Sequence, residues 1–373
     1  MKTPLNSPST VPYTSHQMLG PWLRLTHKIA LSNLHALKRP FKLTYAVTQE
    51  CHSRCLNCNI WKIKPHNELS LAEVEQFAAN SPFLSWVDFT GGEPTDRGDF
   101  VDVVKAFMDH CPDLLLIHFP TNGLQPQRIF DICRQLLSLK PLQLVISVSI
   151  DGPPQLNDQL RGIPNSFRRA IDTYKRISTL RGLTAYIGMT WYPQNRLLVS
   201  QTIAAIKQLI PGFSLRKLHV NLAHASSHYY HNELPPDADQ TGVLAVIQEF
   251  IKERGTPLTP FEWLERAYHK GMVQYLNTKL CPADCVALSA SCFLAQDGTV
   301  YPCSIWNEPL GNIRQHGYSL APLLDSGALP QLRKIIHEKR CPNCWTPCEA
   351  YQSILGNIIP LPHLNKSNRL EPR

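Results

Sequence analysis

Three cysteines stand within eight residues of one another near the start of the chain. Cys51, Cys55 and Cys58 directly follow an apolar, strand-like run over residues 43–48. Three thiols cannot all pair with one another, and a closed tetrahedral iron–sulfur or zinc site takes four protein thiolates. The next cysteine, Cys111, comes about fifty residues later. The loop therefore offers a metal three ligands and leaves one coordination position open for chemistry.

Polar and glycine-containing segments also follow the next three apolar runs. Glycines let a backbone approach a ligand closely, serine and aspartate oxygens suit hydroxyl groups or a turn, and arginine offers a fork for a carboxylate. Each segment alone is compatible with an ordinary turn. Their appearance in order, one after each run, indicates a ligand site. The residues are Gly91, Gly92, Glu93, Pro94, Thr121, Asn122, Gly123, Ser149, Asp151, Gly152 and Arg161, the last of them in the loop beyond the fourth run.

A second group of cysteines lies in the last quarter of the chain. Residues 295–302 are typical of a β-hairpin with an Asp-Gly turn, which would bring the flanking cysteines together. Four thiolates from this region would close a metal cluster with no open position, although a four-thiolate zinc site uses the same ligands. The group comprises Cys281, Cys285, Cys292, Cys303, Cys341, Cys344 and Cys348.

The elements that must position these residues alternate between apolar strands and helices. Six such units predict a parallel sheet covered by helices, which right-handed crossovers curl into a partial (βα)6 TIM-like barrel. In barrels of this kind ligands sit at the C-terminal ends of the strands, which is where each motif falls. The strands are expected at residues 43–48, 84–90, 114–119, 142–150, 184–191 and 215–222. Helices are expected after the Ser70 capping box and at 99–110, 126–139, 166–180 and 197–210.

The spacing and order of these motifs resemble the radical S-adenosylmethionine (SAM) superfamily. The resemblance implies a 4Fe-4S cluster on Cys51, Cys55 and Cys58, with SAM on the fourth iron. It further implies that the Gly91-to-Pro94 segment meets the methionine amino group. SAM would also be bound by the residues after strands three and four, namely Thr121, Asn122, Ser149, Asp151 and Arg161. Where this superfamily often has an aromatic residue before the third cysteine, this chain has Asn57, so Trp61 or Ile187 is expected beside the adenine instead.

The later cysteines resemble the twitch domain, the shortened form of the SPASM extension that follows many radical SAM barrels. That resemblance implies an auxiliary 4Fe-4S cluster on Cys285, Cys303, Cys341 and Cys344. Cys348 is a substitute for one of these ligands, and Cys281 and Cys292 are spare. Cys111 and Cys133, outside both groups, are expected in the core.

The resemblance implies an enzyme that reductively cleaves SAM to a 5′-deoxyadenosyl radical and abstracts a substrate hydrogen atom. The auxiliary cluster would support oxidation or cross-linking of a peptide or small molecule, with flavodoxin or ferredoxin as electron donor. Thr190, Tyr192, His219 and Asn221 are expected to face the substrate, and no general base is nominated. The alternative is a non-catalytic zinc or iron–sulfur scaffold or electron carrier, which would need no SAM site.

The composition of the chain limits which partners and which cellular compartment are expected. The chain has 373 residues and a net charge of +8 without a long basic run, so a nucleic-acid partner is not expected. It shows neither a secretory signal nor an apolar run of about 18 residues, and its twelve cysteines indicate reduced thiols in the cytoplasm. Residues 17–38 predict a basic amphipathic helix that packs on the barrel or lies on a membrane. The histidine-rich run 224–231 is expected to be a substrate-facing or solvated loop rather than a metal site.

These observations predict five segments. They are an N-terminal tail and helix (1–40), the partial barrel (41–225), a helical connection (226–280), the cluster-binding extension of a small β-hairpin and helices (281–350), and a loose C-terminal tail (351–373).

Overall fold

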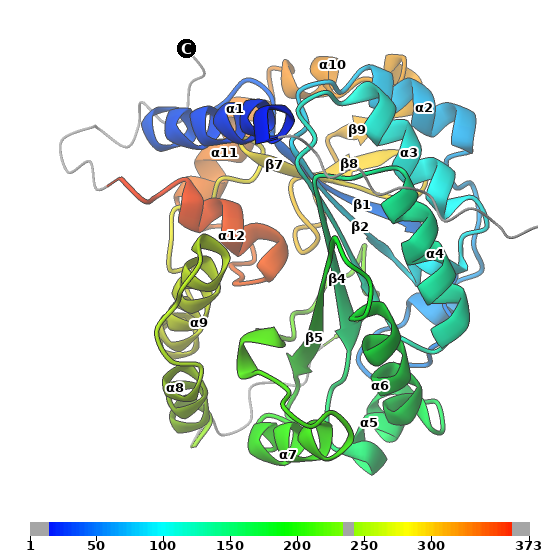
Figure 1. Ribbon diagram of the computed structural model, residues 1–373. Coiled ribbons are helices and arrows are strands. Elements are labelled where there is room, and N and C mark those ends of the chain that lie inside the picture. Colours follow the sequence, from blue (N-terminus) through cyan, green and yellow to red (C-terminus); the bar gives the residue numbers. More distant parts are fainter. Residues whose placement is uncertain (1–14, 234–241, 360–373) are drawn as a thin grey trace, which may run out of the picture.

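A nine-stranded sheet organises the molecule, in the order β6-β5-β4-β3-β2-β1-β7-β8-β9 (Figure 1). The computed structural model describes residues 15–233 and 242–359. The first six strands are parallel, and each overlaps its predicted range. β6 and β9 form the two edges of the curled sheet, so the predicted partial barrel is confirmed. The six strands are β1 (Lys42–Thr48), β2 (Trp86–Gly91), β3 (Leu116–Thr121), β4 (Gln143–Ser149), β5 (Leu183–Trp191) and β6 (Leu218–Leu222).

Helices cover the outer face of the sheet, and alternation along the strands explains why. In β4, Leu144, Ile146 and Val148 are buried in the core beneath the helices, whereas Val145 and Ser147 line the interior of the barrel. The helices between successive strands are α2 (Leu71–Ala79), α3 (Phe100–His110), α4 (Pro126–Ser138), α6 (Ser166–Ile177) and α7 (Val199–Leu209). All five were predicted.

One short helix was missed by the sequence analysis. α5 (Pro154–Arg161) follows β4 and carries Arg161 as its last residue, so this arginine is helical and not in a loop. Gly162 ends the helix in the left-handed conformation, with φ 66°. The low apolar content of α5 concealed it.

Three helices close the open side of the barrel. α9 (Pro260–Thr278) packs against β6 and against its neighbours α8 (Val243–Glu253) and α12 (Pro347–Leu355), opposite the outer helices (Figure 1). The expected loose tail is therefore wrong for residues 351–355, which are helical. Residues 234–241 of the helical connection, and the tails 1–14 and 360–373, lie outside the described residues.

The C-terminal extension shares the barrel's sheet. β7 (Ser291–Leu294) pairs in parallel with β1, and β8 (Thr299–Tyr301) and β9 (Gly311–Asn312) follow antiparallel. The predicted hairpin with its Asp-Gly turn is confirmed, because Gly298 has φ 89° between β7 and β8. The helices α10 (Ala321–Leu324) and α11 (Leu329–His337) complete this region.

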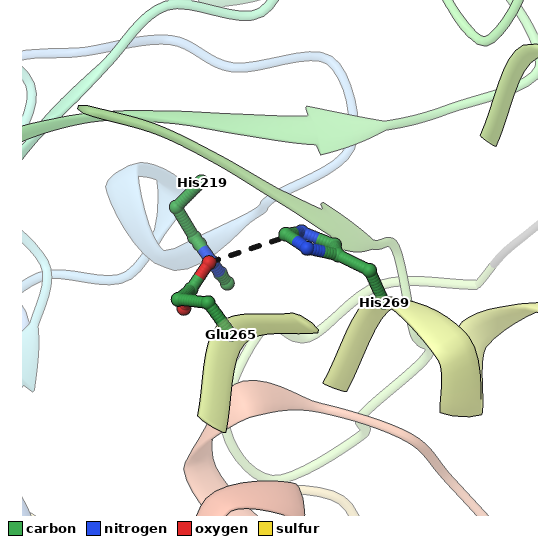
Figure 2. A group of neighbouring side chains, drawn as sticks. All are labelled: His219, Glu265 and His269. Carbon is green, nitrogen blue, oxygen red and sulfur yellow. Dashed lines mark hydrogen bonds and ion pairs between the residues drawn. The ribbon is translucent and has the colours of Figure 1, made fainter. Parts of the chain in front are cut away.

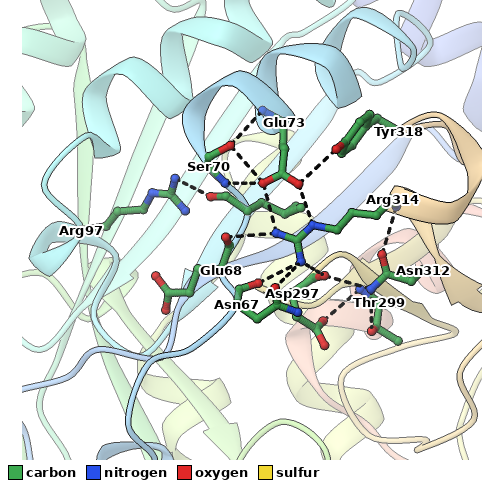
Figure 3. A network of polar contacts seen from close by, with 11 residues as sticks. Asn67, Glu68, Ser70, Glu73, Arg97, Asp297, Thr299, Asn312, Arg314 and Tyr318 are labelled. Carbon is green, nitrogen blue, oxygen red and sulfur yellow. Dashed lines mark hydrogen bonds and ion pairs between the residues drawn. The ribbon is translucent and has the colours of Figure 1, made fainter.

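A polar network fastens the extension to the barrel (Figure 3). Arg314 donates from Nε to the Glu73 carboxylate at 2.6 Å and from Nη2 to the backbone oxygen of Glu68 at 3.2 Å. Glu73 also closes the predicted capping box with Ser70 at the start of α2. Tyr318 donates to the same carboxylate at 3.1 Å. One carboxylate therefore caps a barrel helix and holds the extension.

The N-terminal helix α1 (Ser15–Leu34) packs against the barrel. Leu25 is buried with Phe41 and Leu115, and Lys28 donates to Asp113 at 2.6 Å. Packing therefore accounts for one apolar face of this helix. Across residues 15–233 and 242–359, none of the helices combines the length and apolar character needed to cross a bilayer.

Candidate active site

The cysteine loop after β1 is held by main-chain hydrogen bonds from two sides. The amides of Gly92 and Glu93 donate to the backbone oxygens of Thr48 and Glu50, each at 2.7 Å. On the other side, the Arg54 amide donates to the backbone oxygen of Arg161 at 3.0 Å. The loop is thus clamped between the segment after β2 and the end of α5.

The glycines of this region are required by contacts between backbone segments. A Cβ atom at Gly92 would lie 2.1 Å from the backbone oxygen of Glu50, and one at Gly91, whose φ is 124°, would lie 2.2 Å from that of Thr48. At Gly162 the added atom would lie 2.2 Å from the Arg54 backbone oxygen. The sequence analysis explained Gly91 and Gly92 by close approach to a ligand. The structure gives them an additional and sufficient reason, the close approach of the cysteine loop.

Glu93 is buried and organises the loop after β3. Its carboxylate accepts hydrogen bonds from the Thr121 hydroxyl at 2.8 Å, from the Asn122 amide at 2.6 Å and from the Thr95 hydroxyl at 2.6 Å. Burial raises the pKa of Glu93, against the effect of these hydrogen bonds. Three of the predicted site residues, Glu93, Thr121 and Asn122, therefore form one connected group.

Asp151 and Arg161 form a second group beside the cysteines. One oxygen of Asp151 accepts from the Thr190 amide at 2.8 Å, and the other lies 3.2 Å from Arg161. Arg161 also lies 3.6 Å from the Cys55 sulfur. Both carboxylate oxygens of Asp151 have a partner within the protein, and one of them positions Arg161. Ser149 and Arg161 line the adjoining cavity.

The three thiols of the loop lie in a region of low polarity. Burial raises the pKa of Cys51 to about 12 and that of Cys58 to about 11, and it raises the pKa of Cys55 against the opposing charge of Arg161. Such thiols become thiolates when a metal replaces their protons, because metal binding and deprotonation are coupled. The donor set fits a metal centre.

A cavity of about 810 Å³ begins at this loop and fills the interior of the barrel. Thr190, Tyr192, His219 and Asn221, predicted to face a substrate, all line it. Trp61 lines it as well and donates to the Cys55 backbone oxygen at 3.3 Å. The expectation for Ile187 is wrong, because it is packed in the core on the other face of β5.

The histidine-rich run 224–231 divides between the cavity and its surroundings. His224, Tyr229 and Tyr230 line the cavity, and the Tyr229 hydroxyl lies 2.5 Å from that of Thr90. His228 lies 3.2 Å from the backbone oxygen of Cys303 and stacks on Tyr301. Part of the run thus faces the cavity, as predicted, and part contacts the extension.

Sequence reasoning missed a buried polar group made of Lys42, Asp88 and His118, of which Asp88 and His118 line the cavity. The Lys42 ammonium is fully buried, lies 3.0 Å from Asp88 and donates to the backbone oxygen of Cys348 at 2.5 Å. Asp88 also lies 3.3 Å from His118. Burial would raise the pKa of Asp88, but Lys42 and His118 hold it below its ordinary value. The sequence could have indicated this buried pair, because a lysine and an aspartate each interrupt an apolar strand run.

A separate, nearly filled cavity of about 30 Å³ gathers five cysteines in the extension. Burial raises the pKa of Cys285 and Cys344 well above the ordinary value and that of Cys303 to about 12. Cys348 lines the barrel cavity instead, and Cys292 is buried in the core. The structure therefore groups Cys281, and not Cys348, with the four ligands first predicted. The five are Cys281, Cys285, Cys303, Cys341 and Cys344.

The spacing of the thiols bears on the zinc alternative. Zinc–sulfur bonds of about 2.3 Å would place tetrahedral thiolates roughly 3.8 Å apart. Throughout the part of the chain that the structure describes, the only three metal-binding side chains within 4.8 Å of one another are His219, Glu265 and His269. Among the described residues, neither cysteine set therefore has the spacing of a single tetrahedral zinc site. Cys111 and Cys133 are buried in the core, as predicted.

Comparison with known proteins gives similarities over both the barrel and the extension. Residues 285–349 match the SPASM family, described as an iron-sulfur cluster-binding domain. The chain is 28% identical over 154 residues to the probable GTP 3′,8-cyclase of Thermococcus kodakarensis, covering 38% of this chain and 48% of that one. It is 23% identical over 314 residues to the AdoMet-dependent heme synthase of Oleidesulfovibrio alaskensis, covering 73% and 71%.

These matches identify residues 285–349 as a SPASM domain and support a radical SAM enzyme. A third relative, the mycofactocin maturase MftC of Mycobacterium ulcerans, is 27% identical over 149 residues, covering 39% of this chain and 38% of that one. This chain spans less than half the length of the cyclase and the maturase that it matches.

Solved structures show the same fold at low identity. anSMEcpe with bound AdoMet superposes with a TM-score of 0.53 at 16% identity, covering 80% of this chain and 84% of that one. Streptococcus suis SuiB bound to its precursor peptide SuiA gives 0.50 at 15% identity, covering 81% and 67%. These likenesses show a shared fold over most of this chain.

Proposed function

We propose that this chain is a radical SAM enzyme that oxidises or cross-links a peptide or small molecule. Cys51, Cys55 and Cys58 would hold a 4Fe-4S cluster, and the extension would hold an auxiliary one. Once reduced and with SAM bound, the first cluster would supply one electron to split SAM into methionine and a 5′-deoxyadenosyl radical, and the radical would take a hydrogen atom from the substrate. The observation that carries the proposal is the three-thiol loop opening onto the large barrel cavity.

The cavity rim offers groups that match the parts of SAM. Backbone atoms of Gly91 and Gly92 and the Asn122 side chain lie at the carboxyl ends of β2 and β3. The Arg161 guanidinium is a charged donor for a carboxylate. Asp151 holds it beside the cysteine loop. Trp61 supplies an aromatic wall. Together these residues would orient the cofactor and limit the access of water.

The two cavities suggest separate tasks. The barrel cavity has room for a substrate beside the cofactor, Asp88 and His118 line its wall, and the Lys42 ammonium lies 3.0 Å from the Asp88 carboxylate. The cavity lined by five cysteines is far smaller than the barrel cavity, so we infer that a cluster held there would exchange electrons and would not bind substrate. Glu349 lies in its wall, and burial raises the pKa of this carboxyl to about 7.

The relatives support a substrate of the peptide or small-molecule class. One is named as a maturase, and SuiB was solved with a precursor peptide, while others are named for a nucleotide cyclase and a heme synthase. We further propose a flavodoxin or ferredoxin as electron donor and a reducing, cytoplasmic setting for the twelve free cysteines. Exposed Leu19 and Leu23 on α1 are the residues through which any membrane contact would occur.

Anaerobic purification with metal analysis tests the proposal. The expected protein is brown, holds about eight irons per chain and releases 5′-deoxyadenosine from SAM when reduced. The decisive variant is Arg161→Met, which should retain about eight irons and weaken SAM binding, measured by equilibrium dialysis. A colourless, zinc-loaded protein that leaves SAM intact would support the non-catalytic scaffold instead.

A further inference from the structure

A cluster of three metal-binding side chains lies beside the barrel cavity and shares no residue with either cysteine site (Figure 2). His219 comes from β6, and Glu265 and His269 come from α9. The two α9 residues are four positions apart and so share one face of the helix, toward β6. Their ligand atoms and that of His219 all lie within 4.8 Å of one another.

The distances between the three side chains approach those of a coordination sphere. The Nδ1 atom of His219 lies 3.1 Å from both carboxylate oxygens of Glu265, and the Nε2 atom of His269 lies 3.9 Å from one of them. Ligand bonds of about 2.1 Å in a tetrahedral site would separate nitrogen and oxygen atoms by roughly 3.4 Å. Only small side-chain movements separate the observed arrangement from such a site.

His269 supplies an independent reason to expect a ligand. It is 1% exposed, and neither of its ring nitrogens makes a hydrogen bond of acceptable geometry, although the backbone of Val220 lies near. A buried polar atom without a partner costs about 1–3 kcal/mol. The ring points toward Glu265 (Figure 2), and an ion placed there would give it a partner.

Other groups face the same carboxylate. Tyr351 donates to Glu265, and its hydroxyl lies 3.1 Å from the Nδ1 atom of His219. The Nη2 atom of Arg254 lies 3.7 Å from Glu265, while Nη1 of the same residue donates to the backbone oxygens of Leu215 and Leu218. The arginine is therefore anchored mainly to the backbone. Its charge will weaken the binding of a cation, and the Glu265 charge will strengthen it.

We propose that His219, Glu265 and His269 bind one divalent transition-metal ion. Two imidazoles and one carboxylate are a ligand set found for Zn²⁺ and for non-heme Fe²⁺. His219 and Glu265 line the barrel cavity, so the remaining coordination position would face the substrate. An ion there can hold a carbonyl or carboxylate oxygen of the substrate. This site is independent of SAM and of both cysteine sites.

Zinc retention by the cluster-loaded protein tests the site without reductant or SAM. After anaerobic equilibrium dialysis against Zn²⁺, wild-type protein should retain one zinc per chain more than His269→Ala and Glu265→Gln, at equal iron content. Glu265→Gln keeps the size and hydrogen-bonding capacity of the side chain, so it serves if His269→Ala does not fold. His224→Ala, which removes another buried histidine of the cavity wall, should retain the same zinc as wild type.

X-ray absorption at the zinc edge of the wild-type protein gives a second, variant-free measurement. Nitrogen and oxygen ligands at about 2.0–2.2 Å are expected, whereas sulfur ligands at about 2.3 Å would place the zinc in a cysteine site. The proposal is overturned by sulfur ligation, or by equal zinc contents in wild type and both cluster variants. Failure of SAM cleavage alone would count against the proposed function and leave this site untouched.

Discussion

The cysteine loop after β1 and the five-cysteine cavity of the extension place the same side chain in two different settings. The loop takes its three thiols from one short segment and opens onto a cavity of about 810 Å³. The second site gathers thiols from separate segments around a cavity of about 30 Å³. A metal in the first setting keeps room for a reactant, and a metal in the second is surrounded by protein. This difference is our reason for proposing SAM chemistry at the first site and electron transfer at the second.

The largest effect is expected from removing the three thiols of the loop after β1. Replacing Cys51, Cys55 and Cys58 together by Ala should remove about four of eight irons and all cleavage of SAM. The structural reason is that, among the residues that the structure describes, the only other cysteine lining the barrel cavity is Cys348, whose backbone oxygen accepts from Lys42. Iron analysis and 5′-deoxyadenosine release measure the outcome, and Cys133→Ala in the core is the control. Undiminished SAM cleavage in the triple variant would contradict the comparison.

Single replacements in the second set should distinguish its members. Cys344→Ala should lower the iron content by up to about four per chain while preserving some SAM cleavage. Cys348→Ala should keep the full iron content, because Cys348 lines the barrel cavity. Iron content and absorption near 400 nm show which of these cysteines hold the auxiliary cluster. Loss of iron from Cys348→Ala, with Cys281→Ala unaffected, would reverse the assignment that the structure gives.

The backbone contact beneath the loop can be broken without touching a thiol. In Gly92→Ala the added Cβ would meet the Glu50 backbone oxygen at 2.1 Å, so the loop must shift, and SAM cleavage should fall by at least about tenfold. The auxiliary cluster should remain. Gly98→Ala is the matched control, since nothing lies within 4 Å of its added Cβ. Equal rates of 5′-deoxyadenosine release from both variants would show that the clamp is unimportant.

The smallest effect is expected where the extension is fastened to the barrel. Hydrogen bonds from Arg314 lower the pKa of Glu73 to about 2, from an ordinary value of 4.5. Because the folded-state pKa is depressed, this pair stabilises the fold above pH 4.5, and the contribution disappears as the pH falls toward 2. Arg314→Ala should lower the free energy of unfolding by about 1–3 kcal/mol at neutral pH.

Urea denaturation at several pH values measures that prediction. The difference between wild type and Arg314→Ala should shrink as the pH is lowered from 4.5. Arg340→Ala, which removes an exposed ion pair with Glu338 in the same extension, should change the free energy of unfolding by less than about 1 kcal/mol. A pH-independent difference would mean that Arg314 acts through packing and not through the Glu73 charge.

The sequence by itself determined the strands, most helices and the cysteine loop. Apolar runs of strand length alternate with amphipathic helices, and that local pattern needs no knowledge of distant contacts. The three-then-two spacing of Cys51, Cys55 and Cys58 is likewise local. The hairpin around Gly298 could be predicted because its turn requires a positive φ that glycine adopts at little cost.

Only the tertiary structure decided which distant residues meet. Spacing along the chain could not show that Cys281 joins the five-cysteine cavity while Cys348 faces the barrel. The position of Cys348 depends on which side of α12 packs against the barrel. It could not reveal that Lys42 pairs with Asp88, or that His269 is buried beside His219 and Glu265. Lys42 and Asp88 come from the neighbouring strands β1 and β2. The other contacts depend on how β6, α9 and α12 pack across the open side of the barrel.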